Sequence, residues 1–312
     1  MTSSLSIRHL VGLQGVSESD IRTILDTAVE FRQLLERPVK KVPSLRGLTI
    51  VNLFFENSTR TRTSFELAEK RLSADIVNFS SSSSSVKKGE TLLDTLRNIE
   101  SMKIDVVVVR HKGTGVPQFI ADHSNAIVLN AGDGAHEHPT QALLDMFTIE
   151  QKLGNLKGKK IAIVGDIRHS RVARSDSWGM TTLGASVTLC GPSTLLPRYR
   201  ADFPNVSWET DVKKAVAGAD AVIALRLQKE RMEDSLLPSL REYRNYFGVT
   251  EEVLEKSKDS ALIMHPGPIN RGVELDSDVA DGEHSVILAQ VTNGVAVRMS
   301  ALYLLSGGRA NG

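Results

Sequence analysis

Apolar, β-prone segments alternate with helical patterns along most of the chain, and this alternation restricts the fold more than any other feature. The first strand is expected at 49–55, and the helix that follows it at 60–71. Alternating strands and helices are typical of a parallel sheet that is covered by helices on both faces. The pattern continues with predicted strands at 75–79, 106–110 and 126–130 and predicted helices at 91–101, 117–123 and 140–152.

The alternation restarts after a break at 154–158, which reads Gly-Asn-Leu-Lys-Gly. Strands are then predicted at 160–164, 186–190, 221–225 and 261–264. A chain of 312 residues is long for one core and natural for two. We therefore predict an α/β protein with two doubly wound parallel-sheet domains, residues 1–139 and 140–290. The last apolar stretch predicts a helix, and we expect residues 291–312 to pack back on the first domain.

The transition from the first strand to its helix reads Ser58-Thr59-Arg60-Thr61-Arg62. Ser58 or Thr59 can cap the helix, and the free N–H groups of a helix start attract anions. The helix dipole favours acidic residues at this end, so two arginines there oppose the local preference. We interpret the element as a receptor for a phosphate dianion, because such an anion would offset the two positive charges.

Polar side chains also follow the other predicted strands. In open α/β sheets ligands bind outside the carboxyl ends of the strands, so these residues are candidates for a ligand site. They are cations, imidazoles and amides, which suit a small and strongly anionic ligand set. The residues are Arg110, His111, His138, Gln141, Asp166, Arg168, Arg171, Arg226, Gln228, Arg231, and the run His265-Pro266-Gly267-Pro268.

Metal and dinucleotide sites are both disfavoured by the sequence. His136-Glu137-His138 alternates like ligands on a strand, but the remaining histidines are scattered without a ligand cluster. The turn after Gly165-Asp166 lacks the Gly-x-Gly-x-x-Gly pattern that lets a pyrophosphate approach the backbone. An NAD-dependent oxidoreductase is therefore the weaker reading, and we predict neither a metal nor a cofactor.

Bulk composition excludes several classes of partner. Lys plus Arg number 38 and Asp plus Glu 37, so the net charge indicates neither a nucleic acid nor an anionic membrane as partner. Cys190 is the only cysteine, which excludes an internal disulfide and fits a reducing compartment. No apolar run approaches the roughly 20 residues that span a bilayer. We expect a cytoplasmic protein.

A run of six serines at 80–85 precedes Lys87, Lys88, Gly89 and Glu90. Such a run is typical of a surface loop, because it offers nothing to bury. A loop without function is the simplest interpretation of a serine run. The cations and the helix start that follow it point instead to a functional loop.

Together these motifs make the chain similar to the aspartate carbamoyltransferase catalytic chains, over essentially its whole length. The motifs that carry the resemblance are Phe-Phe-Glu-Asn-Ser-Thr-Arg-Thr-Arg at 54–62, Ser84 with Lys88-Gly-Glu-Thr, Val109-Arg110-His111, Gly132-Asp133-Gly134, His138-Pro-Thr-Gln-Ala-Leu-Leu-Asp145, Gly165-Asp166 with Arg171, Arg226-Leu-Gln-Lys-Glu-Arg231, and His265-Pro-Gly-Pro268.

The resemblance implies transfer of the carbamoyl group of carbamoyl phosphate to L-aspartate, without cofactor, in a cleft between the two domains. It implies a role for each candidate residue. Those roles are phosphate binding by Ser58, Thr59, Arg60 and Thr61, carbonyl polarisation by Thr61, Arg110 and His138, contact with the carbamoyl amine by Gln141 and the Gly267-Pro268 backbone, and aspartate binding by Lys88, Arg171, Arg226 and Gln228. Ser84 and Lys88 would come from the neighbouring chain of a homotrimer, and Glu56 with Arg231 resembles an interdomain pair.

Ornithine carbamoyltransferases share the Ser-Thr-Arg-Thr-Arg element and are the nearest alternative. They typically carry a cysteine where this chain has Thr140, and their His-Cys-Leu-Pro element is replaced here by His265-Pro266-Gly267-Pro268. Arginines also suit a dicarboxylate, whereas ornithine would require an acid for its side-chain amine. A non-catalytic homologue is a second alternative. Such a homologue could lose Arg60, Lys88 or His138, and this chain keeps all three. A regulatory chain or a dihydroorotase remains an open partner.

Overall fold

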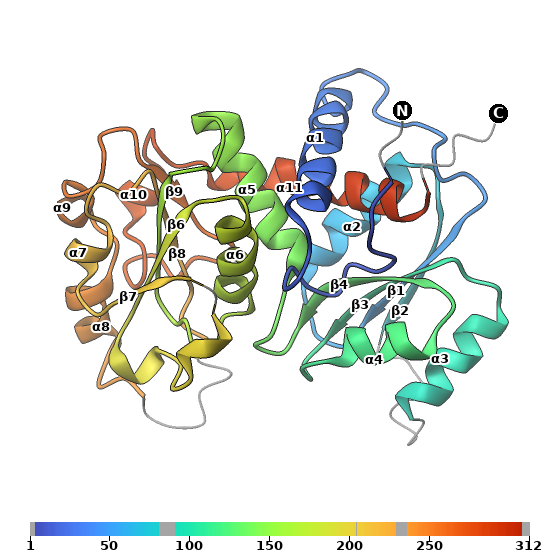
Figure 1. The fold of residues 1–312 in the computed structure, drawn as a ribbon, viewed down its shortest axis with the longest axis horizontal. Coiled ribbons are helices and arrows are strands. Elements are labelled where there is room, and N and C mark those ends of the chain that lie inside the picture. The colour runs from blue at the N-terminus through green and yellow to red at the C-terminus, as the bar shows by residue number, and fades with distance from the viewer. Residues whose placement is uncertain (1–3, 81–90, 204, 229–235, 308–312) are drawn as a thin grey trace. The chain divides into compact units, whose positions relative to one another are not determined.

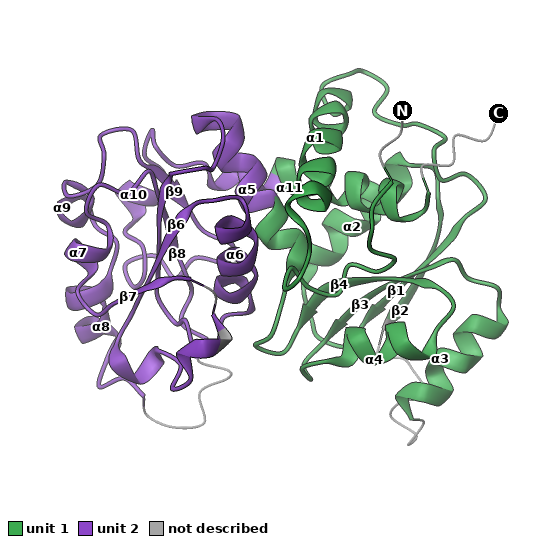
Figure 2. Ribbon diagram, in the orientation of Figure 1, with its two compact units in different colours: residues 1–143, 292–312 green, residues 144–291 purple. Residues whose placement is uncertain are grey.

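We describe the protein from a computed structural model that covers residues 4–80, 91–203, 205–228 and 236–307. The chain divides into two compact units, which are coloured separately in Figure 2. Unit 1 contains residues 1–143 and 292–312, and unit 2 contains residues 144–291. Each unit is described by itself.

Unit 1 is built on a sheet of parallel strands in the order β2-β1-β3-β4 (Figure 1). The chain passes from β1 to β2 on one side and then to β3 on the other, so β1 and β3 form the topological switch point. The strands are β1 Thr49–Phe54, β2 Asp75–Ser80, β3 Val106–His111 and β4 Ile127–Asp133. The helices are α1 Glu18–Leu34, α2 Thr59–Arg71, α3 Leu92–Ser101, α4 Val116–His123 and the beginning of α5 Pro139–Leu153.

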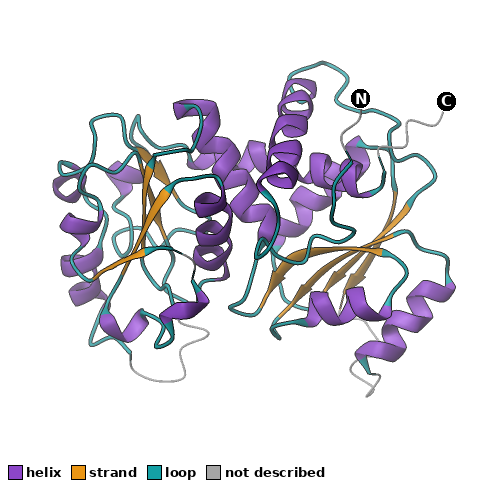
Figure 3. Cartoon of the chain, in the orientation of Figure 1, coloured by secondary structure: helices purple, strands orange, loops and turns teal. Residues whose placement is uncertain are grey.

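Helices cover both faces of this sheet, as the purple helices above and below the orange strands in Figure 3 show. Alternate residues of β1 point to opposite faces. Val51 and Leu53 pack in one core with Leu96 of α3 and Ile120 of α4. On the other face Asn52 donates a hydrogen bond to Glu69 of α2, with 2.9 Å between Nδ2 and Oε2.

The last helix, α11 Ile287–Leu305, enters unit 1 at Thr292. There the Ser300 hydroxyl donates to the Ile24 carbonyl of α1 at 2.7 Å, and Arg298 donates to the Ser64 hydroxyl of α2 at 2.9 Å. The guanidinium of Arg298 also lies 5.0 Å from the ring centre of Phe65. The end of the chain is therefore held against helices from its beginning.

Glu69 is a fully buried carboxyl group in unit 1. Burial raises its pKa from 4.5 to about 7, only partly opposed by the Asn52 hydrogen bond. The second carboxyl oxygen, Oε1, accepts no hydrogen bond from the residues that the structure describes. The folded state therefore binds a proton more tightly than the unfolded chain between these two pH values.

Glu69→Gln is expected to abolish a pH dependence of stability. Because the folded pKa is the higher one, the contribution of Glu69 to the free energy of unfolding should fall by about 3 kcal/mol as the pH rises from 4.5 to 7. Urea unfolding of both proteins at pH 5 and pH 8 measures this. Equal stability at pH 5 with a more stable variant at pH 8 is the expected result. A variant whose free energy of unfolding is lower than that of the native protein by the same amount at pH 5 and at pH 8 would contradict this prediction.

Unit 2 contains a second parallel sheet, in the order β7-β6-β5-β8-β9. Its switch point lies between β5 and β8, since β5 is followed by β6 on one side and by β8 on the other. The strands are β5 Lys160–Val164, β6 Ser186–Cys190, β7 Ser207–Glu209, β8 Ala221–Ala224 and β9 Leu262–Met264. The helices are α6 Arg171–Thr182, α7 Val212–Ala215, α8 Leu240–Phe247, α9 Glu251–Leu254 and α10 Ser277–Ala280, with short 3₁₀ helices η2 Ser193–Leu195 and η3 Arg200–Asp202.

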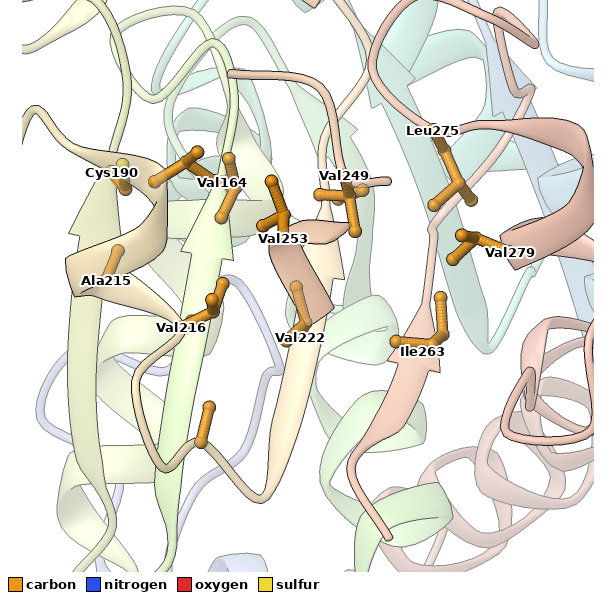
Figure 4. Close-up of a cluster of buried hydrophobic side chains, with 14 of the residues drawn as sticks. Val164, Cys190, Ala215, Val216, Val222, Val249, Val253, Ile263, Leu275 and Val279 are labelled. Atoms are coloured by element: carbon orange, nitrogen blue, oxygen red, sulfur yellow. The ribbon is translucent and has the colours of Figure 1, made fainter. Parts of the chain in front are cut away.

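One face of this sheet packs against short helices through small and β-branched side chains. Figure 4 shows Val164, Val222 and Ile263 of the strands meeting Val216 and Val253 in this core. Valine and alanine dominate this core, and valine is typical of strands that are buried on both faces. The rigid sheet places the carboxyl ends of β5, β8 and β9 at one edge.

The predicted fold class is confirmed, because both sheets are parallel and helices alternate with their strands. Strand β7 was not predicted, since three residues are too few to show a period. Among the described residues, no helix is long and apolar enough to cross a membrane.

Candidate functional site

The phosphate element lies at the switch point of unit 1. Strand β1 ends at Phe54, and Ser58 in extended conformation (φ −158°, ψ 94°) precedes the first residue of α2. The Ser58 hydroxyl makes no capping hydrogen bond within the described part of the chain. The N–H groups of this helix start therefore lack the usual side-chain acceptor, which leaves the position suited to an anion.

The two arginines of this element have different surroundings. Arg62 Nε lies 2.9 Å from Glu66 Oε1, one helical turn further on. Arg60 is exposed, and Thr61 between the arginines is buried. Arg62 therefore forms an ion pair within α2. Arg60 is the arginine whose side chain is exposed at the start of this helix.

Arg110 lies beside this helix start, because β3 pairs with β1 at the switch point. Phe54 is opposite Arg110 in the register, and the Phe55 N–H donates to the Arg110 carbonyl at 2.9 Å. Its guanidinium donates to the Ala131 carbonyl of β4 at 3.0 Å and lies 3.4 Å from Glu56 Oε1. These contacts hold the side chain of Arg110 at the carboxyl edge of the sheet.

His138 is buried immediately before α5, and its carbonyl accepts the Gln141 N–H at 2.9 Å. The preceding turn is held by a buried polar cluster. In it Asn130 Nδ2 donates to Asp133 Oδ1 at 2.9 Å, and the Glu137 N–H donates to the same oxygen at 2.9 Å. Burial alone would raise the pKa of Asp133, but hydrogen bonds, with that from His136 the strongest, lower it. The cluster fixes the backbone from which α5 begins, and with it the positions of His138 and Gln141.

Glu137 has a structural role that the sequence did not reveal. Its carboxylate accepts the Leu13 N–H at 2.7 Å and the Gln14 N–H at 3.2 Å. A Cβ at Gly12 would lie 2.5 Å from Glu137 Oε1, so the glycine permits this approach. The alternating His-Glu-His run is thus a turn tied to the N-terminal segment. No group of three or more potential metal ligands occurs among the described residues.

At the switch point of unit 2, β5 ends in the turn Gly165-Asp166. Gly165 has φ +143°, and a Cβ there would lie 2.6 Å from the Leu225 carbonyl oxygen after β8. Only glycine lets the two strand ends approach this closely. The buried Asp166 then accepts hydrogen bonds from its own turn, at 3.2 Å from the His169 N–H and 2.9 Å from His169 Nδ1.

Asp166 also connects the residues that follow β8. Its Oδ2 accepts the Gln228 N–H at 3.3 Å, and Gln228 Oε1 accepts from Arg226 Nη2 at 3.3 Å. Arg171, the first residue of α6, is buried, whereas Arg168 is exposed. The carboxylate of Asp166 therefore holds the backbone that carries the cationic and amide groups of this edge.

The third group of unit 2 follows β9, next to β8. It is the segment His265-Pro266-Gly267-Pro268, with His265 buried and a cis peptide bond between Gly267 and Pro268. The Gly267 N–H donates to His265 Nδ1 at 2.7 Å. Three of the predicted residues, Ser84, Lys88 and Arg231, lie outside the described residues.

These two sheets define an α/β protein of two units, in which arginines follow the strands at both switch points. Residues 8–151 match the carbamoyl-phosphate-binding domain of aspartate/ornithine carbamoyltransferases, and residues 157–305 match the Asp/Orn-binding domain. The chain belongs to the aspartate/ornithine carbamoyltransferase family.

Within the family, the chain is similar in sequence to aspartate carbamoyltransferase catalytic subunits and similar in fold to both aspartate and ornithine carbamoyltransferases. It is 60% identical to the aspartate carbamoyltransferase catalytic subunit of Gemmatimonas aurantiaca over 97% of this chain and 94% of that protein. Aspartate transcarbamoylase from Trypanosoma cruzi, solved with carbamoyl phosphate, has a TM-score of 0.85, 29% identity and 95% coverage of both chains. Ornithine carbamoyltransferase from Pyrococcus furiosus has a TM-score of 0.87, 30% identity and coverage of 98% of this chain and 99% of that chain. The resemblance to aspartate carbamoyltransferase catalytic chains is thereby confirmed.

Proposed function

We propose that this chain is an enzyme that transfers the carbamoyl group of carbamoyl phosphate to the amine of L-aspartate. The products are N-carbamoyl-L-aspartate and phosphate, an early step of de novo pyrimidine biosynthesis. The observation that carries this proposal in the structure is the presence of cationic groups at both switch points, with an amide beside them in unit 2. Arg60 and Arg110 lie at that of unit 1, and Arg226 and Gln228 at that of unit 2.

The acceptor is aspartate rather than ornithine for an electrostatic reason. Asp166 accepts a hydrogen bond from the Gln228 N–H, and its oxygens also accept hydrogen bonds from His169. The side-chain ammonium of ornithine would need an acid here whose oxygens are not already hydrogen-bonded within the protein. Arg171 and Arg226 supply the positive charge that two carboxylates require.

In this mechanism the amine of aspartate attacks the carbamoyl carbon directly. A C–N bond forms, the bond from that carbon to the phosphate oxygen breaks, and the leaving phosphate takes the proton of the amine. Ser58, Thr59, Arg60 and Thr61 hold the phosphate, and Thr61, Arg110 and His138 stabilise charge on the carbonyl oxygen. Gln141 and the Gly267-Pro268 backbone bind the carbamoyl amine, while Arg171, Arg226, Gln228 and Lys88 bind aspartate.

The domains and the assembly belong to the same proposal. Residues 1–139 with 291–312 form the carbamoyl-phosphate domain, and residues 140–290 form the aspartate domain. The active unit is a cytoplasmic homotrimer in which Ser84 and Lys88 complete the site of the neighbouring chain. A regulatory chain or a dihydroorotase would be a further partner of this trimer.

The identity of the product tests the proposed reaction. The purified protein is incubated with carbamoyl phosphate and either L-aspartate or L-ornithine, and the products are separated and identified by mass. We expect N-carbamoyl-aspartate, with little or no citrulline. Citrulline as the preferred product would make the chain an ornithine enzyme, and the absence of both products would favour a non-catalytic homologue.

A further inference from the structure

A buried amide in unit 2 connects the segment after β9 with helix α5. The Gln290 side chain, at the start of α11, accepts the His265 N–H through Oε1 at 3.0 Å. Its Nε2 donates to Asp145 Oδ1 of α5 at 2.6 Å. Gln290 is 3% exposed and Asp145 is fully buried. Because both ends of the amide are engaged away from water, its orientation is fixed and both partners are held at a set separation.

The imidazole of His265 extends this connection into the following loop. Its Nδ1 accepts the Gly267 N–H at 2.7 Å, so the proton of the neutral ring must lie on Nε2. Nε2 is 3.3 Å from Oε1 of the buried Glu274, and that oxygen also accepts the Asn270 N–H at 2.6 Å. The loop 265–270 is therefore held from inside at its first, third and last residues.

Three consecutive carbonyl oxygens in the middle of this loop differ from that of Asn270, which accepts the Val273 N–H at 3.0 Å. Among the residues that the structure describes, no hydrogen bond ends on the carbonyl of Pro266, Gly267 or Pro268. A loop that is fixed through its N–H groups and keeps these carbonyls without an internal donor is suited to accept hydrogen bonds from an amine of a ligand.

Asp145 connects the same amide to a second element of the proposed site. It follows Gln141 by four residues in α5, so the two side chains lie on one face of that helix, one turn apart. Asp176 of α6 is fully buried, and neither of its carboxyl oxygens has a partner among the described residues. Burial and then the charge of Asp145 raise the pKa of Asp176 well above its usual range.

We propose that Gln290 is a positioning residue of the reaction, which sets the loop carbonyls of 266–268 at the place where the carbamoyl amine must bind. The inference rests on the proposed function. Gln290 itself touches no substrate. It acts through His265 on the loop and through Asp145 on the helix that carries Gln141.

Gln290→Leu tests this, because leucine is similar in size and can form neither hydrogen bond. The readout is the affinity for carbamoyl phosphate compared with that for inorganic phosphate, which has no carbamoyl amine to meet the loop. We expect binding of carbamoyl phosphate to weaken about 10-fold while phosphate binding is unchanged, since hydrogen bonds to one group are lost. The turnover rate should fall about 10- to 100-fold, because the reacting carbon is misplaced.

Gln118→Leu is the matched control. Gln118 Nε2 donates to Asp122 Oδ1 at 2.7 Å in α4, the same kind of bond at an exposed position. This variant should bind both ligands as the native protein does. If Gln290→Leu fails to fold, Gln290→Asn replaces it, because asparagine stays polar but is too short to reach both partners.

The experiments distinguish failure of the positioning role of Gln290 from failure of the proposed reaction. Equal weakening of both ligands, or no change in either, would overturn the positioning role while leaving the native reaction intact. A native protein that forms no N-carbamoyl-aspartate would overturn the proposed function itself.

Discussion

Arg60→Ala is expected to lower the rate of N-carbamoyl-aspartate formation about 100- to 1000-fold, the loss typical of one preorganised donor to developing charge. The helix start that carries Arg60 has no acidic residue in its first turn, and the Ser58 hydroxyl makes no capping bond there within the described residues. Two arginines at the positive end of a helix are unfavourable without an anion. In the proposed reaction the phosphate leaving group supplies that anion, and its charge grows in the transition state. Steady-state assays with saturating substrates measure the effect.

Arg62→Ala is the control for this prediction. Arg62 belongs to the same first turns of α2, but its side chain is 40% exposed and paired with Glu66 at 2.9 Å. Exposed pairs of this kind contribute about 0.5 kcal/mol or less, so the rate should stay within about twofold of the native value. A comparable loss in the two variants would show that α2 as a whole, rather than the Arg60 guanidinium, is what the reaction requires.

Mixing two inactive proteins is expected to restore activity. Arg60→Ala and Lys88→Ala chains should each be nearly inactive alone, because in the proposed trimer every site of either variant would lack one essential cation. After unfolding and joint refolding in equal amounts, about one site in four would combine an intact Arg60 from one chain with an intact Lys88 from its neighbour, by random assembly of a cyclic trimer. The activity per chain of the mixture, compared with refolded native protein, measures the recovery.

Refolding each variant alone is the necessary control, since recovery must depend on mixing. Activity that stays at the level of the separate variants, although the mixed trimers form, would rule out sites that are shared between chains. Lys88 lies outside the described residues, so this experiment also tests directly the role that the resemblance implies for it.

Much of the fold could be predicted because its elements have strong local patterns. Strands β5 and β6 have the predicted bounds, and α2 begins one residue before the predicted position. Strand β7 was missed, and the helices between the strands of unit 2 were expected only without bounds, because elements as short as β7, α7 and α9 show no period. Helix α11 begins four residues before the predicted stretch, and its first turn carries Gln290.

The candidate site was predictable where its residues follow strands, because parallel strands deliver their carboxyl ends to one edge. Arg110, Arg226 and Gln228 were found by this rule. The supporting residues were not, since a buried acid such as Glu137 or Glu274 looks like any other surface acid in a sequence. The signal for Glu137 was present only as part of a misleading His-Glu-His run, and Gln290 gave none.

The sequence alone determined the alternation of strands and helices, the helix start with two arginines, and the motifs that place the chain in its family. These are properties of neighbouring residues, and local sterics, periodicity and charge are enough to specify them. Only the tertiary structure decided that Arg62 pairs with Glu66 and that Gln290 joins His265 to Asp145. Gln290 and Asp145 are 145 residues apart in the chain. A hydrogen bond over that separation depends on which elements pack together, and burial then fixes its partners because water is excluded.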